Sequence, residues 1–118
     1  MARHFGVRTY RQTITLANTP QPLLTQTQIS AGHSPFTEAI KVSVDPAGTG
    51  KWTVGDSDVS VNTDNATDGF PNDAGDFVTY GIDPKVAAMP SEFDLREIYI
   101  VGTVAGDEFY VEYVAKVD

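Results

Sequence analysis

The stretch "NTDNATDG" at 62–69 is the part of the chain that most resembles a metal-binding loop. Its spacing invites comparison with the calcium loop D-x-[DN]-x-[DN]-G, where each named position supplies an oxygen ligand. Aligned on the final glycine, the ligand positions fall on Asp64, Ala66 and Asp68, and the bidentate glutamate position falls on Gly75. Ala66 and Gly75 have no ligand oxygen, so the stretch is not an EF-hand. We interpret it as a solvated acidic loop, and we expect no bound metal and no cofactor.

The residue groupings that enzymes use are also missing. There is no cysteine, which excludes a thiolate zinc site and a cysteine nucleophile. Ser57 lies in "GDSDV" and not in G-x-S-x-G, and His4 and His33 form no HxH or HExxH grouping. "GTGK" at 48–51 lacks the first glycine of a phosphate-binding loop and is followed by Trp52 instead of Ser or Thr. The sequence therefore predicts that this protein is not an enzyme.

Apolar residues alternate along most of the chain, which indicates strands, and prolines, glycines and aspartates separate the alternating runs. The pattern predicts strands at 10–17, 23–30, 37–44, 51–54, 58–61, 76–82, 96–104 and 107–117. Only the segment 83–93 suits a helix, and its two prolines limit it to about one turn. We expect an all-β, single-domain β-sandwich, jelly-roll-like, with about eight short antiparallel strands and little helix.

Three local features refine this expectation. "AGD" at 105–107 predicts a tight hairpin turn between the last two strands. Trp52, the only tryptophan, lies in an alternating strand and is expected in the core. Gly55 should supply the backbone freedom for a turn or bulge, with Asp56 and Ser57 bonding to neighbouring N–H groups. The Thr- and Gln-rich positions 25–28 suggest an edge strand that is open to another chain.

Charge is distributed unevenly along the chain, whose net charge is −8. The first eleven residues hold three arginines and no acid, so we expect a basic N-terminal arm at 1–11 and a sandwich domain at 12–118. The acidic remainder is a poor match for phosphates, which excludes nucleic acid as a partner. No run approaches the ~18 apolar residues of a membrane helix. The N-terminus has no apolar signal region, so synthesis in the cytoplasm is expected.

Two stretches are similar to a recurrent pattern in small phage virion proteins. They are "TGKWTVGDSDVSV" at 49–61 and "FDLREIYIVGTVAGDEFYVEYVAKV" at 93–117. The pattern has apolar-x-V-G-[DN]-S-x-V, a Gly- and Pro-rich loop, and D-L-x-x-I-Y-V-x-G-x-x-G-[DE] before an alternating strand. "QTITLANTPQPL" at 12–23 also resembles the opening of such proteins. The connection at 65–92 departs from their usual short turn, so the resemblance implies a fold and a general role but no binding residue.

The resemblance implies a capsid decoration (cement) protein, a non-enzymatic structural subunit of the virion. Its partners would be the major capsid protein and itself, as a homotrimer, on the capsid exterior of a bacteriophage. One alternative is a head-fibre, tail or baseplate module in host recognition. Another is a carbohydrate-binding module, which would need Trp52, Tyr80 or Phe70 exposed in a row on one face.

The residues expected to contact a partner come from the basic N-terminus and from the acidic loop. The arginines would contact an acidic or polar shell surface, and the loop would meet the shell or a sibling subunit. These candidates are Arg3, Arg8, Arg11, Asp64, Asp68 and Phe70.

Overall fold

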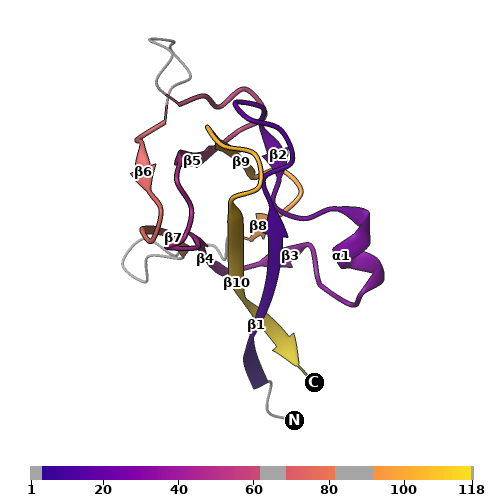
Figure 1. Ribbon diagram of the computed structural model, residues 1–118. Coiled ribbons are helices and arrows are strands. Elements are labelled where there is room, and N and C mark those ends of the chain that lie inside the picture. Colours follow the sequence, from indigo (N-terminus) through magenta and orange to yellow (C-terminus); the bar gives the residue numbers. More distant parts are fainter. Residues whose placement is uncertain (1–3, 62–68, 82–91, 118) are drawn as a thin grey trace.

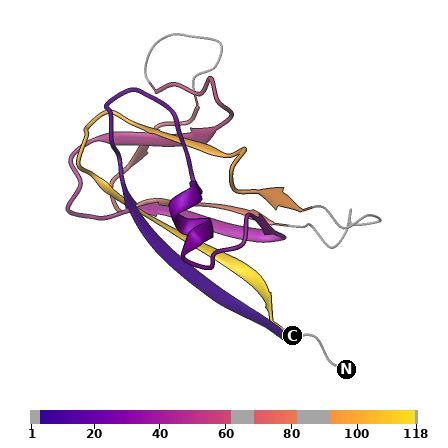
Figure 2. The same cartoon turned by 90° about the vertical axis from the view of Figure 1, so that its right-hand side faces the viewer.

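The computed structural model describes residues 4–61, 69–81 and 92–117, which fold into two facing antiparallel sheets (Figures 1 and 2). Sheet A has the strand order β1–β10–β4–β7. Its strands are β1 (His4–Thr13), β10 (Glu108–Val117), β4 (Ala39–Val44) and β7 (Phe77–Gly81). Sheet B has the order β2–β9–β5–β6. Its strands are β2 (Gln21–Pro22), β9 (Tyr99–Gly102), β5 (Lys51–Gly55) and β6 (Asn72–Asp73).

Two smaller elements complete the described part of the chain. Strands β3 (Phe36–Thr37) and β8 (Phe93–Asp94) form a short antiparallel pair, and α1 (Gln26–Ser30) is a single short helix. Figure 2 shows the two sheets as separate layers whose connections close one end of the sandwich. The prediction of an all-β, antiparallel, single-domain fold is confirmed, and its jelly-roll-like connectivity stays a prediction.

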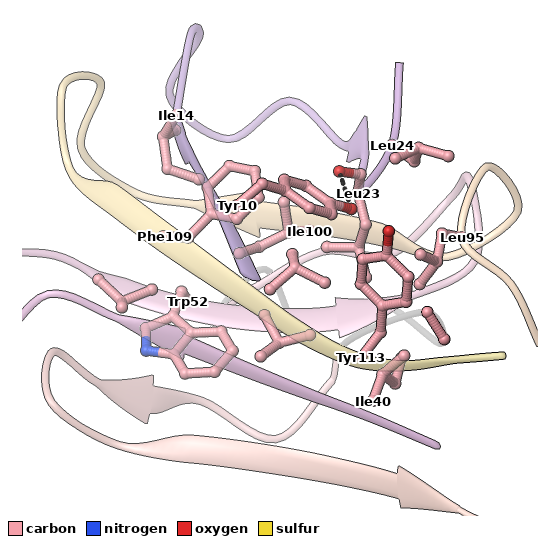
Figure 3. Close-up of a cluster of buried hydrophobic side chains, with 14 residues drawn as sticks. Tyr10, Ile14, Leu23, Leu24, Ile40, Trp52, Leu95, Ile100, Phe109 and Tyr113 are labelled. Atoms are coloured by element: carbon pink, nitrogen blue, oxygen red, sulfur yellow. Dashed lines mark hydrogen bonds between the residues drawn. The ribbon is translucent and has the colours of Figure 1, made fainter. Parts of the chain in front are cut away.

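The core lies between the sheets and follows from the alternation of the strands (Figure 3). Three apolar side chains of β4 face sheet B, and each of them is at most 3% exposed. Phe109, Val111 and Tyr113 of β10 are buried in the same way. Sheet B supplies Trp52 and Ile100. The prediction that Trp52 is a core residue is confirmed, because its side chain is 1% exposed and its Nε1 donates to the Asp73 carbonyl at 2.9 Å.

The expected strand at 58–61 is reduced to one bridge residue, Ser60, in a segment that covers the outer face of sheet B. Val59 and Val61 are buried there against Val101 of β9. Asp56 accepts the Asp58 N–H at 2.9 Å, as predicted for this turn. Gly55, however, is the last residue of β5, and its role is steric. A Cβ atom at Gly55 would lie 2.7 Å from a methyl carbon of Val59.

The expected strand at 23–30 is wrong, because this segment enters α1. Leu23 and Leu24 are consecutive and both buried, so the alternation already fails before the helix. The Thr25 N–H donates to the Gln28 side-chain oxygen at 2.8 Å, as in a capping box. This Thr-x-x-Gln spacing was the signal for a helix start. The polar edge strand expected at 25–28 is therefore absent, and these residues form the start of α1.

The hairpin expected around 105–107 is also wrong. Strand β9 belongs to sheet B and β10 to sheet A, so the chain passes from one layer to the other. Gly106 has φ 97°, a conformation that favours glycine. Its N–H donates to the Ile14 carbonyl at 2.9 Å, so this connection is fixed against the end of β1 and not against β9.

The basic N-terminal arm expected at 1–11 needs the same kind of correction. From His4 on, this segment is β1, which pairs with β10 along its whole length. The first strand therefore begins six residues earlier than position 10, where the alternation predicted it. Arg8 and Arg11 do not prevent strand formation. Both side chains are exposed, and each guanidinium group lies near an oxygen atom of the chain.

Other predicted strands lie close to their observed positions. The segments 37–44, 76–82, 96–104 and 107–117 each contain an observed strand, shortened by up to three residues at an end. The strand predicted at 51–54 extends one residue further, to Gly55. The segment 83–93 falls mostly outside the described residues. Within the described ranges, no helix is long and apolar enough to cross a membrane.

Candidate interaction surface on sheet A

His33, a side chain that could perform chemistry, is engaged in the fold. In the described part of the chain, no group of three or more His, Cys, Asp or Glu residues could hold a metal ion. His33 contacts the Tyr113 hydroxyl through its Nδ1 at 2.8 Å. Burial and the nearby Arg8 guanidinium lower the pKa of His33. Asp64 and Asp68 of the acidic loop lie outside the described residues.

Two half-buried carboxylates are held by hydrogen bonds within the chain. Asp45 accepts the Ala47 N–H and the Tyr110 hydroxyl, both at 2.8 Å, and these bonds hold the pKa of Asp45 below its usual value. Arg96 donates to both oxygens of Asp94 and lowers the pKa of that carboxyl. Both arrangements stabilise turns, and each carboxylate already has its partners within this chain.

Arg8 and Arg11 of β1 point to opposite faces of sheet A. Arg8 faces inward, and its Nη1 donates to the Gly32 carbonyl at 2.8 Å. It lines a hollow of about 200 Å³ together with Phe36 and other residues of the β3 region. Arg11 faces outward and lies 3.5 Å from a Glu108 oxygen. This ion pair is exposed and contributes at most about 1 kcal/mol, so Arg11 can exchange its partner at small cost.

The predicted contact residues do not form one patch. Phe70 is 80% exposed beside β6, the edge strand of sheet B. β1 lies at the other side of the sandwich, because it is the edge of sheet A that is stacked over β2 (Figure 1). Arg3 lies outside the described residues. The structure therefore separates Phe70 from Arg8 and Arg11.

The outer face of sheet A carries apolar side chains that sequence reasoning missed. Val7 of β1 is 70% exposed and Phe77 of β7 is 58% exposed, and both point to this face. The Lys41 ammonium lies 4.5 Å from the centre of the Phe77 ring. Between them lies a shallow hollow of about 250 Å³ bordered by Val7, Thr79 and Val114. The signal was present in the alternation of β1 and β7, which places an apolar residue on both faces.

Strands β1 and β10 extend together beyond the rest of sheet A. β4 pairs with residues 109–113 of β10, whereas β1 pairs with 108–117. The distal part is therefore a two-stranded ribbon, and the pair of His4 with Val117 lies at its tip (Figures 1 and 2). Thr37 of β3 packs on one side of this ribbon, where its hydroxyl donates to the Val114 carbonyl at 2.8 Å. Two-stranded ribbons are only marginally stable on their own, so the outer side of this one would gain from packing against a partner.

In comparisons with known proteins, no family model, no curated protein and no solved structure matches this chain.

Proposed function

We propose that this protein is a non-enzymatic subunit of a bacteriophage virion that decorates and stabilises the capsid exterior. It is made in the host cytoplasm, binds the major capsid protein, and assembles with itself as a homotrimer. The projecting β1–β10 ribbon, with exposed apolar side chains on the outer face of sheet A, is the observation that carries the proposal. The similarity of residues 49–61 and 93–117 to small virion proteins supports it.

The ribbon suits contact with a shell for physical reasons. It presents an apolar surface around Val7 and Val114, and polar residues such as Lys41, Thr79 and Glu112 border it. Apolar surface at the centre with polar groups around it is the usual composition of a stable protein interface. The body of the protein then stays at the shell surface, where its net charge of −8 faces solvent.

A head-fibre, tail or baseplate position is the alternative within the same structural class. The carbohydrate-binding alternative has less support, because Trp52 is buried and cannot stack on a sugar. Of the three aromatic residues that this alternative needed, only Tyr80 and Phe70 are exposed. Tyr80 lies in β7 of sheet A, whereas Phe70 lies beside β6 of sheet B.

Co-sedimentation of the purified protein with phage heads that lack it tests the proposal. We expect saturable binding to the heads. Val114→Asp should weaken the binding affinity about tenfold or more, because it places a negative charge at the centre of the proposed apolar contact. Leu16→Asp is the matched control, because Leu16 is an exposed apolar residue outside the ribbon. Absence of binding to heads contradicts the decoration role, and equal loss in both variants contradicts the ribbon as the contact.

Immuno-electron microscopy of purified virions separates the two virion positions. Label on the head supports decoration, and label restricted to the tail or baseplate replaces it with the alternative. A glycan array tests the carbohydrate-binding alternative independently.

A further inference from the structure

Sheet A ends in two strands, β1 and β7, whose outer edges carry backbone groups to which no described residue bonds. Ile14 donates its backbone N–H to the Asp107 carbonyl at 2.8 Å, which fixes the phase of the β1–β10 ladder. Hydrogen-bonded residues alternate along an antiparallel pair, so the even-numbered residues of β1 point their backbone groups at β10. Val7, Thr9 and Arg11 therefore point theirs to the open edge, where no described residue bonds to them.

Strand β7, the other edge of sheet A, also has backbone groups that point away from the sheet. Gly75 donates its N–H to the Val44 carbonyl at 2.9 Å, so the even-numbered residues of β4 face β7. Their partners in the ladder are even-numbered, because Val42 pairs with Val78. Phe77, Thr79 and Gly81 are left with backbone groups on the open edge, again without a bond from any described residue.

We propose that the open edge of β7 in one copy of this chain pairs with the open edge of β1 in a second copy. Every neighbouring pair in sheet A is antiparallel, so β1 and β7 run in opposite directions. Placing the two sheets side by side with the same orientation makes the new pair antiparallel too. The contact thus continues sheet A from one subunit into the next.

Register and side chains fit this pairing. When Thr9 lies opposite Thr79, Val7 lies opposite Gly81 and Arg11 lies opposite Phe77. In this register all three residues with outward backbone groups on each edge have a partner. All these side chains point to the outer face, where exposed Val7 and Phe77 would lose contact with water. The aliphatic stem and guanidinium of Arg11 can pack on the Phe77 ring.

Charge favours this contact over a β1–β1 pair. Strand β1 holds two arginines and no acid, whereas β7 holds no charged residue and directly follows Asp76. A β1–β1 pair would bring four arginines together in one sheet, which like-charge repulsion disfavours. The β1–β7 pair instead places the arginines of β1 beside an uncharged strand with Asp76 at its start, as complementary interfaces do.

Such a contact is heterologous, because each subunit uses a different edge on its two sides. Heterologous contacts form rings when the rotation closes. The inference rests on the self-assembly in the proposed function and names the strands that carry it. The test below contains no capsid, so its failure leaves shell binding untouched, and failure of head binding leaves this contact untouched.

Thr9→Pro and Thr79→Pro test the contact in the full chain. Each proline removes one backbone N–H that points to the open edge and leaves the bonds within sheet A intact. We expect light scattering to give an oligomer for the unchanged protein and a monomer for each variant. An equimolar mixture of the two variants should form a two-chain complex and nothing larger, because one intact β1 edge meets one intact β7 edge.

Three results overturn the proposal. They are an unchanged protein that stays monomeric at high concentration, a single variant that keeps the oligomeric mass, and a variant mixture that stays monomeric. Circular dichroism and thermal unfolding show whether each variant is folded.

A second pair of variants keeps every backbone donor and tests the register if a proline variant does not fold. Thr9→Lys with Thr79→Lys places like charges opposite each other, and Thr9→Lys with Thr79→Glu places opposite charges there. We expect the second combination to associate about fivefold more tightly. Equal association of both combinations contradicts the pairing of Thr9 with Thr79.

Discussion

His33 and Tyr113 are joined across 80 residues of sequence by a contact of 2.8 Å between Nδ1 and the hydroxyl oxygen. The Tyr113 oxygen also accepts the Ser34 N–H at 3.1 Å, so its own proton is free to point at His33. Neutral His33 then accepts at Nδ1 and carries its proton on Nε2. The Tyr10 ring packs against both side chains. This cluster fixes the connection after α1 onto sheet A.

Stability should therefore fall as the solution becomes mildly acidic. The pKa of His33 is below 6.5 in the folded protein, because of burial and the Arg8 cation, and near 6.5 when unfolded. Between these two pKa values the unfolded state binds more protons than the folded state. The free energy of unfolding therefore decreases as pH falls below about 6.5. Urea unfolding between about pH 7.5 and about pH 5.5 should show this decrease.

His33→Gln provides the control, since glutamine keeps a hydrogen-bonding side chain without a titrating charge. Its unfolding free energy should change less over the same window. Asp45 and Asp94 do not interfere in this pH range. Their pKa values are lowered in the folded protein, so the stability that their charged forms contribute is lost only as pH falls toward about 3.8 and below. Parallel pH profiles for both proteins would show that His33 is not the responsible group.

Tyr113→Phe should lower the unfolding free energy by about 1–3 kcal/mol. The change removes the hydroxyl that Ser34 and His33 use, and leaves two partly buried polar groups without that partner. Tyr110→Phe is the matched control, since its hydroxyl donates to Asp45, which keeps the Ala47 N–H. Denaturant unfolding should give the larger loss for Tyr113→Phe, and the reverse order contradicts the role of the cluster.

The long-range part of this fold explains which sequence predictions failed. Alternation predicted β4, β5 and most of β10, because each of these strands buries one face against a common core. It could not show that β9 and β10 lie in different sheets, since a short Gly-containing turn serves a hairpin and a sheet crossing equally well. The bond from Gly106 to Ile14, which decides between them, joins residues 92 positions apart in sequence.

Local chemistry explains the failures at the N-terminus and at α1. Charge in the first eleven residues suggested an arm, yet pairing with β10 satisfies the backbone of residues 4–13 whatever their charge. Thr25 and Gln28 carried a helix-start signal that the search for alternation overlooked. For the proposed interaction surface, the sequence pointed to Arg11 but not to Phe77, because only the strand order makes β7 an edge.

Gly55→Ala should destabilise the protein by about 1–3 kcal/mol through overpacking. The added Cβ would lie 2.7 Å from one Val59 methyl carbon and 2.9 Å from the Val59 Cβ. Gly81→Ala is the control, because among the described residues its Cβ would meet only the Ala39 Cβ at 3.8 Å. Val59→Ala added to Gly55→Ala should cost less than the sum of the single changes, and strict additivity in denaturant unfolding would contradict this contact.

Asp107→Ala should lower the unfolding free energy by about 1–3 kcal/mol, because this carboxylate joins the connections at the closed end of the sandwich. Its two oxygens accept the N–H groups of Thr49 and Gly50 at 3.3 and 3.0 Å, which fixes the β4–β5 connection against the start of β10. Bonds to a charged acceptor are stronger than neutral ones, and their loss leaves the Gly50 donor without that partner. Glu97→Ala removes an equal charge at an exposed position and should change stability by no more than about 0.5 kcal/mol. Urea unfolding of the two variants at neutral pH separates the local bonds from a general charge effect. Equal losses in both would assign the effect to charge alone.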